Sequence, residues 1–350
     1  MESQYQIQQH DIEETVKNLP ILNELEGRHI LVTGATGLLG TYISKVILCF
    51  NRLYGKNIHI IVNGRSHERI KDVYNHQPVH EVIGDVCSPI VTDLPVDYII
   101  HCASITSSQA FVNTPVDTIK TLLLGTYNLL ELAKQKRVKG FLYISSLEIY
   151  GIPFKFNVKE DDYGYIDILN ARSSYSEGKR MAECMCRAYA EQFEVPTRIA
   201  RLTQTIGPGI AYDDNRVFAQ FARSVIERKD IVLNTAGRTV RSYCDISDAV
   251  RAIITILLKG KTGEAYNIAN PKTEISIADL ATFVCDQNPD SGIKVIFSTP
   301  DNLSSLGYNP EMKISLCIDK IQKLGWTPRY GLKEIFQKLI NGLNEQRKRI

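Results

Sequence analysis

Long apolar runs and a strong charge of either sign are both missing from this 350-residue sequence. No stretch approaches the ~18 consecutive apolar residues that a membrane-spanning helix requires. The 41 basic and 39 acidic residues leave a formal net charge of +2, which gives no electrostatic argument for binding nucleic acid or a membrane surface. The first residues, MESQYQIQQHDIEETVKNLP, have neither the basic start nor the apolar centre of a signal peptide. We therefore expect a cytoplasmic protein with no nucleic-acid partner and no membrane partner.

The cysteines also lack the spacing of a zinc site or of a disulfide framework. Eight of them are scattered along the chain, and Cys184 and Cys186 are too close together for a usual disulfide. We expect reduced thiols and no metal site.

Short apolar runs of strand length alternate with helical segments from His29 onward. A helical run from Thr114 to Lys136 separates the last two of these apolar runs. The strand-like runs are HILVT, NIHIIVNG, VHEVIGDV, DYIIHCAS and GFLYISSLEIYG. Such an alternation predicts an α/β fold with a doubly wound, or Rossmann, parallel sheet of about six or seven strands.

Three segments follow from this pattern. Residues 1–27 form an N-terminal extension, in which Ile12, Val16 and Leu19 indicate a short packing helix. Residues 28–200 form the Rossmann domain. After Arg201 the pattern becomes less regular, so residues 201–350 are expected to be a mixed segment: a smaller C-terminal α/β portion, with some chain returning to the Rossmann sheet.

The sequence TGATGLLG places Gly34, Gly37 and Gly40 between a predicted strand and a predicted helix. A glycine turn in this context lets the backbone approach a pyrophosphate, which the free N–H groups at the helix start then bind. It predicts a dinucleotide site.

The end of the second strand bears on which dinucleotide is bound. An acidic residue usually stands there to bind the ribose 2′-hydroxyl of NAD, but this strand ends in Asn63, Gly64 and Arg65. Arg65 could accommodate the 2′-phosphate of NADP, or it could be a solvated loop residue with Asn63 on the ribose. Asp85 ends the third strand and could reach the adenine. NAD and NADP both remain open.

Tyr175 and Lys179 lie four residues apart in SSYSEGKRMAE, so on a helix they share a face. A lysine ammonium beside a phenol favours the phenolate, which could take a proton from a sugar hydroxyl. Ser145 and Ser146 end the preceding strand, at the edge where open α/β sheets place ligands. We therefore expect Ser145 and Ser146 to share a crevice with Tyr175 and the glycine turn.

With these residues in place, the sequence resembles the extended short-chain dehydrogenase/reductase family, the NAD-dependent epimerases and dehydratases of nucleotide sugars. The resemblance extends from His29 to Leu339. Its motifs, in the family's order, are TGATGLLG, GDV, HCAS, SSLEIYG, YSEGK, RLTQTIGPG, VRSYCDISDA, EAYNIAN and LGWTP.

The resemblance implies an enzyme whose catalytic residues are Ser146, Tyr175 and Lys179, with residues 201–350 binding the nucleotide sugar. It also implies that Arg241 grips the substrate diphosphate, for which a bidentate guanidinium is suited. Ser145, Ser146 and Gln204 complete the expected substrate site. The cofactor would be held by Gly34, Thr36, Gly37, Leu38, Gly40, Asn63, Arg65, Asp85, Val86, Ala103, Ser104, Tyr175 and Lys179. Homodimers would form through the 114–136 and 173–192 helices, with Leu123, Leu129 and Leu130 supplying apolar surface.

Glu148 is the residue that bears on the reaction. Members of the family first oxidise sugar C4. The 4-keto sugar then rotates in the site (epimerases), loses water across C5–C6 (dehydratases) or loses its C6 carboxylate (decarboxylases). Dehydratases and decarboxylases of the family carry a glutamate at this position, where a carboxylate can act as the base at C5. Leu147, however, replaces the residue that protonates the leaving hydroxyl in many dehydratases, and Gln204 replaces a usual asparagine. Before LGWTP, Lys313 is the nearest candidate to hold a substrate carboxylate.

The sequence thus favours a dehydratase or decarboxylase that acts on a nucleotide-activated hexose. A nucleotide-sugar 4-epimerase is the main alternative, and an NADPH-dependent 4-keto sugar reductase is the next. A non-catalytic protein that binds sugar nucleotides or NADP is a different class, which the presence of Ser146, Tyr175 and Lys179 disfavours.

Overall fold

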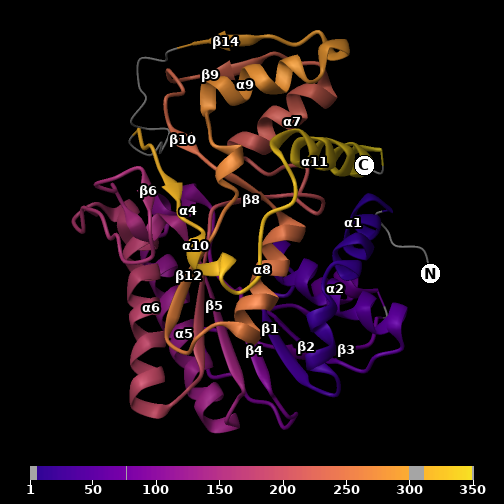
Figure 1. Cartoon of the computed structure of the whole chain (residues 1–350), viewed down its shortest axis with the longest axis vertical. Helices are drawn as coiled ribbons and strands as arrows, with labels where there is room; N and C mark the ends of the chain where they lie inside the picture. Colours follow the sequence, from indigo (N-terminus) through magenta and orange to yellow (C-terminus); the bar gives the residue numbers. More distant parts are fainter. Residues whose placement is uncertain (1–5, 76, 299–310, 349–350) are drawn as a thin grey trace.

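The computed structural model describes residues 6–75, 77–298 and 311–348. A sheet flanked by helices forms the larger part of the molecule, and a smaller group of helices and short strands caps one end of it (Figure 1). Residues 1–5 of the predicted extension lie outside the described part of the chain.

Seven parallel strands form the sheet, in the order β12-β7-β5-β4-β1-β2-β3. Their bounds are β1 His29–Thr33, β2 His59–Gly64, β3 Val79–Ile83, β4 Tyr98–His101, β5 Gly140–Ser146, β7 Thr197–Leu202 and β12 Glu264–Ile268. The strand order reverses direction between β1 and β4, so the carboxyl ends of these two strands meet at the point where such sheets bind ligands. The predicted doubly wound sheet and its strand number are confirmed.

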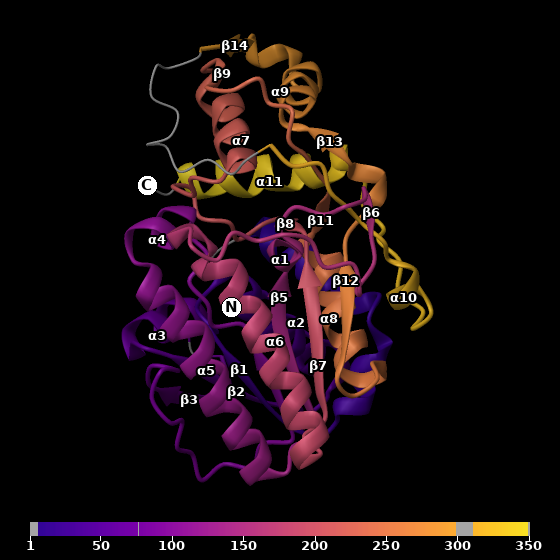
Figure 2. The same ribbon diagram turned by 90° about the vertical axis from the view of Figure 1, so that its left-hand side faces the viewer.

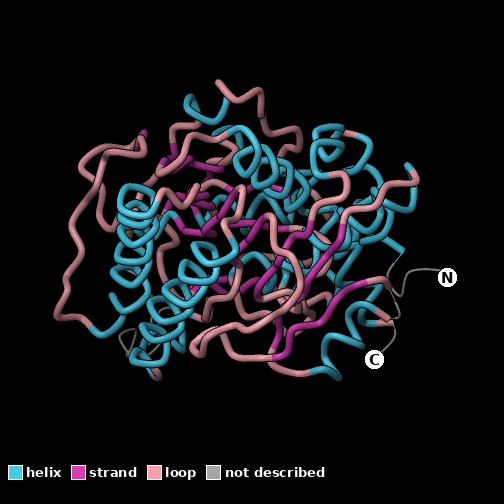
Figure 3. The backbone as a smooth tube through the Cα atoms, turned by 90° about the horizontal axis from the view of Figure 1, so that it is seen from below, coloured by secondary structure: helices cyan, strands magenta, loops and turns pink. Residues whose placement is uncertain are grey.

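The helices cover both faces of the sheet, as Figures 2 and 3 show from two further directions. One face carries α2 (Leu38–Tyr54), α3 (His67–Tyr74) and α8 (Ile246–Lys259). The other carries α5 (Pro115–Lys136) and α6 (Ser174–Phe193), which pack against each other. Both faces of the central strands are therefore buried, and this explains why the strands read as continuous apolar runs in the sequence.

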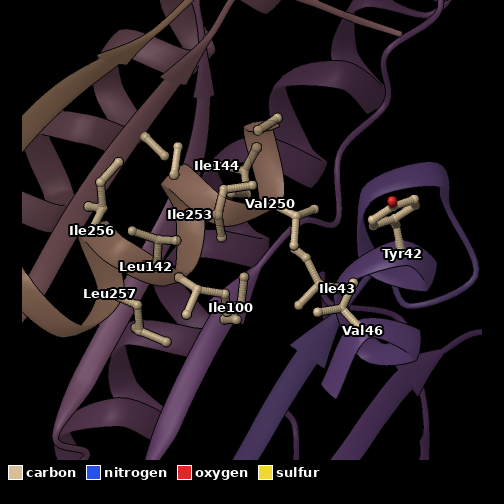
Figure 4. Close-up of a cluster of buried hydrophobic side chains, with 14 of the residues drawn as sticks. Tyr42, Ile43, Val46, Ile100, Leu142, Ile144, Val250, Ile253, Ile256 and Leu257 are labelled. Atoms are coloured by element: carbon tan, nitrogen blue, oxygen red, sulfur yellow. The ribbon is translucent and has the colours of Figure 1, made fainter. Parts of the chain in front are cut away.

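Alternation along β1 divides the core into two layers. Ile30 and Val32 belong to the cluster beneath α2 and α8, whereas Leu31 belongs to the cluster beneath α5 and α6. Figure 4 shows the first layer, in which Val250, Ile253 and their neighbours on α8 lie over side chains of β4 and β5. This two-sided packing holds the carboxyl ends of the strands in fixed positions.

The cap contains the C-terminal helices and four two-stranded sheets. Its apolar core is formed by α7 (Val217–Glu227), α9 (Ile277–Asp286) and α11 (Leu332–Arg347). The small sheets pair β11 (Tyr243–Asp245) with β8 (Gln204–Ile206), β10 (Val240–Arg241) with β13 (Ile275–Ser276), β14 (Val295–Phe297) with β9 (Ile231–Leu233), and β15 (Ser315–Leu316) with β6 (Asn157–Val158). Because β12 and α8 return to the large sheet, the chain crosses between the two parts more than once. Short helices α4 (Ser108–Asn113) and α10 (Asp319–Gln322) complete the described elements other than 3₁₀ turns and α1.

The N-terminal helix α1 (Gln6–Lys17) lies between α2 and α11 (Figure 1). Ile12, Val16 and Leu19 are buried, which confirms the predicted packing helix. Asp11 on this helix accepts a hydrogen bond from Tyr42 of α2 at 2.6 Å and pairs with Lys338 of α11 at 2.7 Å. The extension thus connects the sheet to the cap.

Within the described ranges, no helix is long and apolar enough to cross a membrane. The same residues hold no group of three or more histidine, cysteine or acidic side chains arranged to bind a metal ion.

Candidate active site

The glycine turn between β1 and α2 requires glycine for steric reasons. Gly34 has φ of 61°, and a Cβ there would lie 2.8 Å from the backbone of Ala103, which follows β4. A Cβ on Gly40 would collide with the Gly34 carbonyl oxygen. Gly37 caps the N-terminus of α2, whose free N–H groups open onto the turn. This cradle, which a side chain would fill, fits the pyrophosphate of a dinucleotide.

The adenosine end of the predicted cofactor site contains fewer free groups than expected. The Asn63 side chain is buried, and its amide nitrogen donates to the carbonyls of Val82 at 3.0 Å and Gly84 at 3.2 Å, so only its amide oxygen is left for a ribose hydroxyl. Arg65 is exposed. The backbone N–H of Cys87 donates to Asp85 at 2.8 Å and lowers the pKa of that carboxyl, with a smaller contribution from the charge of Arg65. The Asp85 carboxylate and the Arg65 guanidinium therefore interact electrostatically at the adenosine end of the site.

Three other predicted cofactor contacts follow strands β3 and β4. Val86 is buried, and its side chain lies where a Cβ on Gly125 of α5 would be, which explains the glycine in that helix. Ala103 and Ser104 follow β4 beside the glycine turn and are half-buried.

The catalytic residues expected from the motifs do come together. Ser146 is the last residue of β5, and Tyr175 lies in the first turn of α6, with Lys179 one turn later. Both Tyr175 and Lys179 are buried. Burial raises the pKa of the Tyr175 phenol, and the Ser146 side chain acts in the opposite direction, so the serine hydroxyl and the phenol lie close together.

Burial acts against ionisation of both partners. It raises the pKa of the Tyr175 phenol, and the nearby charge of Glu148 raises it further. It also lowers the pKa of the Lys179 ammonium to about 8. The ammonium donates to the Ile144 carbonyl at 2.7 Å and lies 5.7 Å from the centroid of the Tyr175 ring. In this structure, burial therefore outweighs the effect that we expected from the neighbouring ammonium.

Ser145 differs from the expectation that it would contact the substrate. Its hydroxyl is buried and donates to Glu183 on α6 at 2.5 Å. Glu183 also pairs at 2.6 Å with the buried guanidinium of Arg201. This guanidinium donates further hydrogen bonds to the hydroxyls of Tyr150 at 2.8 Å and Tyr163 at 3.0 Å. Ser145 therefore belongs to this polar network, whereas Ser146, the last residue of β5, lies close to the phenol of Tyr175.

Glu148 stands between two guanidinium groups. Its Oε1 lies 3.8 Å from Nη1 of Arg241, and its Oε2 lies 3.4 Å from Nη1 of Arg172. The Arg172, Glu148 and Arg241 side chains are only 17%, 17% and 10% exposed. The structure thus brings the predicted diphosphate ligand Arg241 to the predicted C5 base, beside Tyr175.

Arg172 is a site residue that our sequence analysis missed. It belongs to a 3₁₀ turn (Ala171–Ser173) that leads directly into α6, three residues before Tyr175. The signal that could have revealed it is the presence of a basic residue just before the catalytic tyrosine, at the carboxyl edge of the sheet.

The remaining predicted positions lie at the boundary with the cap. Gln204 is half-buried in β8, which pairs with β11 two residues after Arg241. Leu147 is buried in the apolar core and offers no proton. Lys313 is exposed, and its backbone pairs with Val240.

Comparison with known proteins identifies the family of this chain. The model of the NAD dependent epimerase/dehydratase family matches residues 30–269. UDP-glucuronic acid decarboxylase 6 of Arabidopsis thaliana is 31% identical over 315 residues, which cover 87% of this chain and 85% of the relative. UDP-glucuronic acid decarboxylase 1 of Xenopus tropicalis is 28% identical over 91% of this chain and 73% of its own length.

Solved structures show the same fold at lower identity. UDP-glucose 4-epimerase from Thermotoga maritima matches with a TM-score of 0.76 and 20% identity, over 91% of this chain and 99% of that one. dTDP-glucose 4,6-dehydratase from Bacillus anthracis, solved with NAD, matches with a TM-score of 0.74 and 19% identity, over 92% of this chain and 98% of that one. The resemblance inferred from the sequence motifs is confirmed, and the chain belongs to the NAD-dependent epimerase/dehydratase family of enzymes.

Proposed function

We propose that this chain decarboxylates a nucleotide-linked hexuronic acid through a 4-keto intermediate, with UDP-glucuronic acid as the first candidate substrate. The observation that carries the proposed oxidation at C4 is the group of Ser146, Tyr175 and Lys179 at the carboxyl edge of the sheet. The several relatives that are UDP-glucuronic acid decarboxylases, at about a third identity, support the choice of reaction.

Tyr175 accepts the proton of the sugar O4 hydroxyl as C4 becomes a ketone. To do so the phenol must first be ionised, and the Ser146 hydrogen bond and the positive charge of Lys179 both favour its ionised form. A bound nicotinamide would supply the acceptor for the C4 hydride and would return that hydride at the end, so that the overall reaction needs no external oxidant.

The new ketone makes the C6 carboxylate a β-keto acid. The C5–C6 bond then breaks, carbon dioxide leaves, and the bonding electrons move to O4 as an enolate. Ser146 and protonated Tyr175 lie where they can hydrogen-bond that oxygen. A proton from solvent then adds to C5 in place of the lost carboxylate, and as C4 is reduced O4 recovers its proton from Tyr175, so the tyrosine ends each cycle as it began.

Dehydration across C5–C6 is the second candidate, and Glu148 favours it because a carboxylate can remove the C5 proton. Leu147 weighs against it, because this buried apolar side chain cannot protonate a leaving C6 hydroxyl. Decarboxylation needs neither the removal of a C5 proton nor the protonation of a leaving hydroxyl.

We propose NAD as the dinucleotide, on the basis of the family and of the groups at the adenosine end. A 2′-phosphate would meet Arg65, but it would also meet the carboxylate of Asp85, which interacts with that arginine. Titration of the protein with each dinucleotide tests this choice: NAD should bind more tightly than NADP, and the reverse order would contradict it.

The reaction is tested by incubating the protein with NAD and UDP-glucuronic acid and reading the products by mass. We expect loss of carbon dioxide from UDP-glucuronic acid and no loss of water from UDP-glucose or dTDP-glucose. Tyr175→Phe is the matched control, because it removes only the proton-accepting oxygen; we expect its turnover to fall by about 10²–10⁴-fold while dinucleotide binding persists. A product of unchanged mass and altered stereochemistry would instead identify a 4-epimerase.

A further inference from the structure

Arg172 is a half-buried cation that the proposed mechanism does not use. Its guanidinium lies 5.7 Å from the ring centroid of Phe111, and that ring stacks on the catalytic Tyr175 at 4.3 Å. It also lies 3.4 Å from Glu148, two residues beyond Ser146. Arg172 therefore stands beside the reacting part of a sugar whose O4 is held by Tyr175 and Ser146.

Two cationic side chains lie beside the carboxylate of Glu148. Two guanidinium groups, Arg172 and Arg241, pair with this one carboxylate, at N–O distances of 3.4 and 3.8 Å. Each guanidinium also has a buried nitrogen without a hydrogen-bond partner, Nε of Arg172 and Nη1 of Arg241. Buried donors in this condition are costly, so an anionic ligand that accepts from them gains a stronger interaction than it would at the surface.

The two arginines are suited to two different anions of one substrate. Arg241 comes from the cap and would take the diphosphate, as the family motif implies. Arg172 comes from the start of α6, three residues from Tyr175. Because a hexuronate carries its carboxylate on C5, next to C4, that carboxylate would lie on the Tyr175 side of the site.

We propose that Arg172 binds the C6 carboxylate of the substrate and so selects nucleotide-linked hexuronic acids over neutral hexoses. The inference rests on the proposed function and assigns a specificity-determining residue to it. Lys313, the position that we first considered for this role, is exposed. Substrate binding would exchange the long contact between Arg172 and Glu148 for a bidentate guanidinium–carboxylate pair.

Two nucleotides that differ only at C6 provide the test. UDP-glucuronic acid carries the carboxylate, whereas UDP-xylose has the same diphosphate and ring hydroxyls without C6. Their dissociation constants are measured by calorimetry on the NAD-loaded protein in a Tyr175→Phe background, so that turnover does not interfere. Arg172→Gln should weaken binding of UDP-glucuronic acid by about 10- to 100-fold and change binding of UDP-xylose less than about threefold.

Two further variants make the comparison specific. Arg187→Gln removes an equal charge from an exposed position of α6, where Arg187 pairs with Glu191, and should change neither constant. Arg241→Gln should weaken both nucleotides alike, because both carry the diphosphate. Binding of UDP-xylose by Arg172→Gln also shows that this variant is folded.

The inference is overturned if Arg172→Gln weakens both nucleotides equally or leaves both unchanged. It is also overturned if the parent protein binds UDP-glucuronic acid no more tightly than UDP-xylose. Failure of the proposed function gives a different result: wild-type protein would release no carbon dioxide, whatever the binding constants are. Arg172→Lys, which keeps the charge but not the planar fork, should lie between wild type and Arg172→Gln.

Discussion

The ring of Tyr175 stacks on the ring of Phe111, with centroids 4.3 Å apart and planes inclined by 14°. Phe111 comes from the short helix α4, so a segment far from Tyr175 in the sequence fixes the orientation of the catalytic phenol. The same contact contributes to the burial of the phenol, and burial is the main cause of its raised pKa. Phe111 thus positions Tyr175 and at the same time opposes its ionisation.

Phe111→Ala should separate these two effects. Removing a buried phenylalanine should lower the free energy of unfolding by about 3 kcal/mol, measured by urea denaturation. Turnover of this variant should fall by about 10-fold or more, because the phenol is held less firmly and a small misplacement of a catalytic group slows the reaction. Phe111→Leu is the control that keeps an apolar side chain but removes the stacked ring. Unchanged turnover in Phe111→Ala, at protein concentrations where it is folded, would contradict the positioning role.

Deprotonation of the Lys179 ammonium should lower turnover at alkaline pH. Burial lowers the pKa of its ammonium to about 8, from an ordinary value of 10.5, so the side chain is charged below this pH and neutral above it. Its positive charge favours the Tyr175 phenolate, and turnover should therefore fall as pH rises through about 8. Lys179→Arg, which stays charged, should lack this alkaline limb even if its overall rate is lower. A wild-type profile that keeps rising above pH 9 would argue against a role for the ammonium.

Glu148→Gln distinguishes the reactions open to this site. Glutamine keeps the size of the side chain and a hydrogen-bonding oxygen, but it cannot accept a proton at neutral pH. A dehydratase that uses Glu148 as its C5 base should lose dehydration and accumulate reduced nicotinamide, visible in its absorbance band. A decarboxylase should keep more of its activity, because loss of carbon dioxide from a 4-keto acid needs no base at C5. Collapse of carbon dioxide release in this variant would show that Glu148 has an essential part in decarboxylation.

We propose that the chain forms homodimers through the outer faces of α5 and α6. Of the three leucines first expected there, Leu129 and Leu130 are instead buried in the chain's own core, against the sheet. The exposed apolar side chains on these helices include Leu124, Tyr127 and Met181. Leu124→Arg should convert a dimer into a monomer, as measured by light scattering at micromolar concentration. Leu53→Arg, at a residue of α2 with similar exposure (44% against 45% for Leu124), is the matched control.

The sequence by itself determined the architecture of the sheet and indicated most of the residues that we propose as catalytic. Buried parallel strands must be apolar along their whole length, so β1, β2, β4 and β5 could be recognised as short continuous runs. Gly34 was recognisable because a tight turn against the Ala103 backbone excludes every other residue. Tyr175 and Lys179 share a helix face by their spacing alone.

The tertiary structure alone decided which polar side chains reach the site. Ser145 and Ser146 are adjacent in the sequence, and only the packing of α6 against β5 gives one to Glu183 and the other to the phenol. Glu148, Arg172 and Arg241 come from three separate elements, and their meeting depends on how the cap folds back over the sheet. The pKa of Tyr175 likewise depends on burial, to which Phe111 and Leu122 contribute from other helices, and no local spacing encodes this. These contacts are set by packing between residues that are far apart in the sequence. The sequence could therefore reduce the number of possible reactions, but it could not predict which charged side chains lie together in the site.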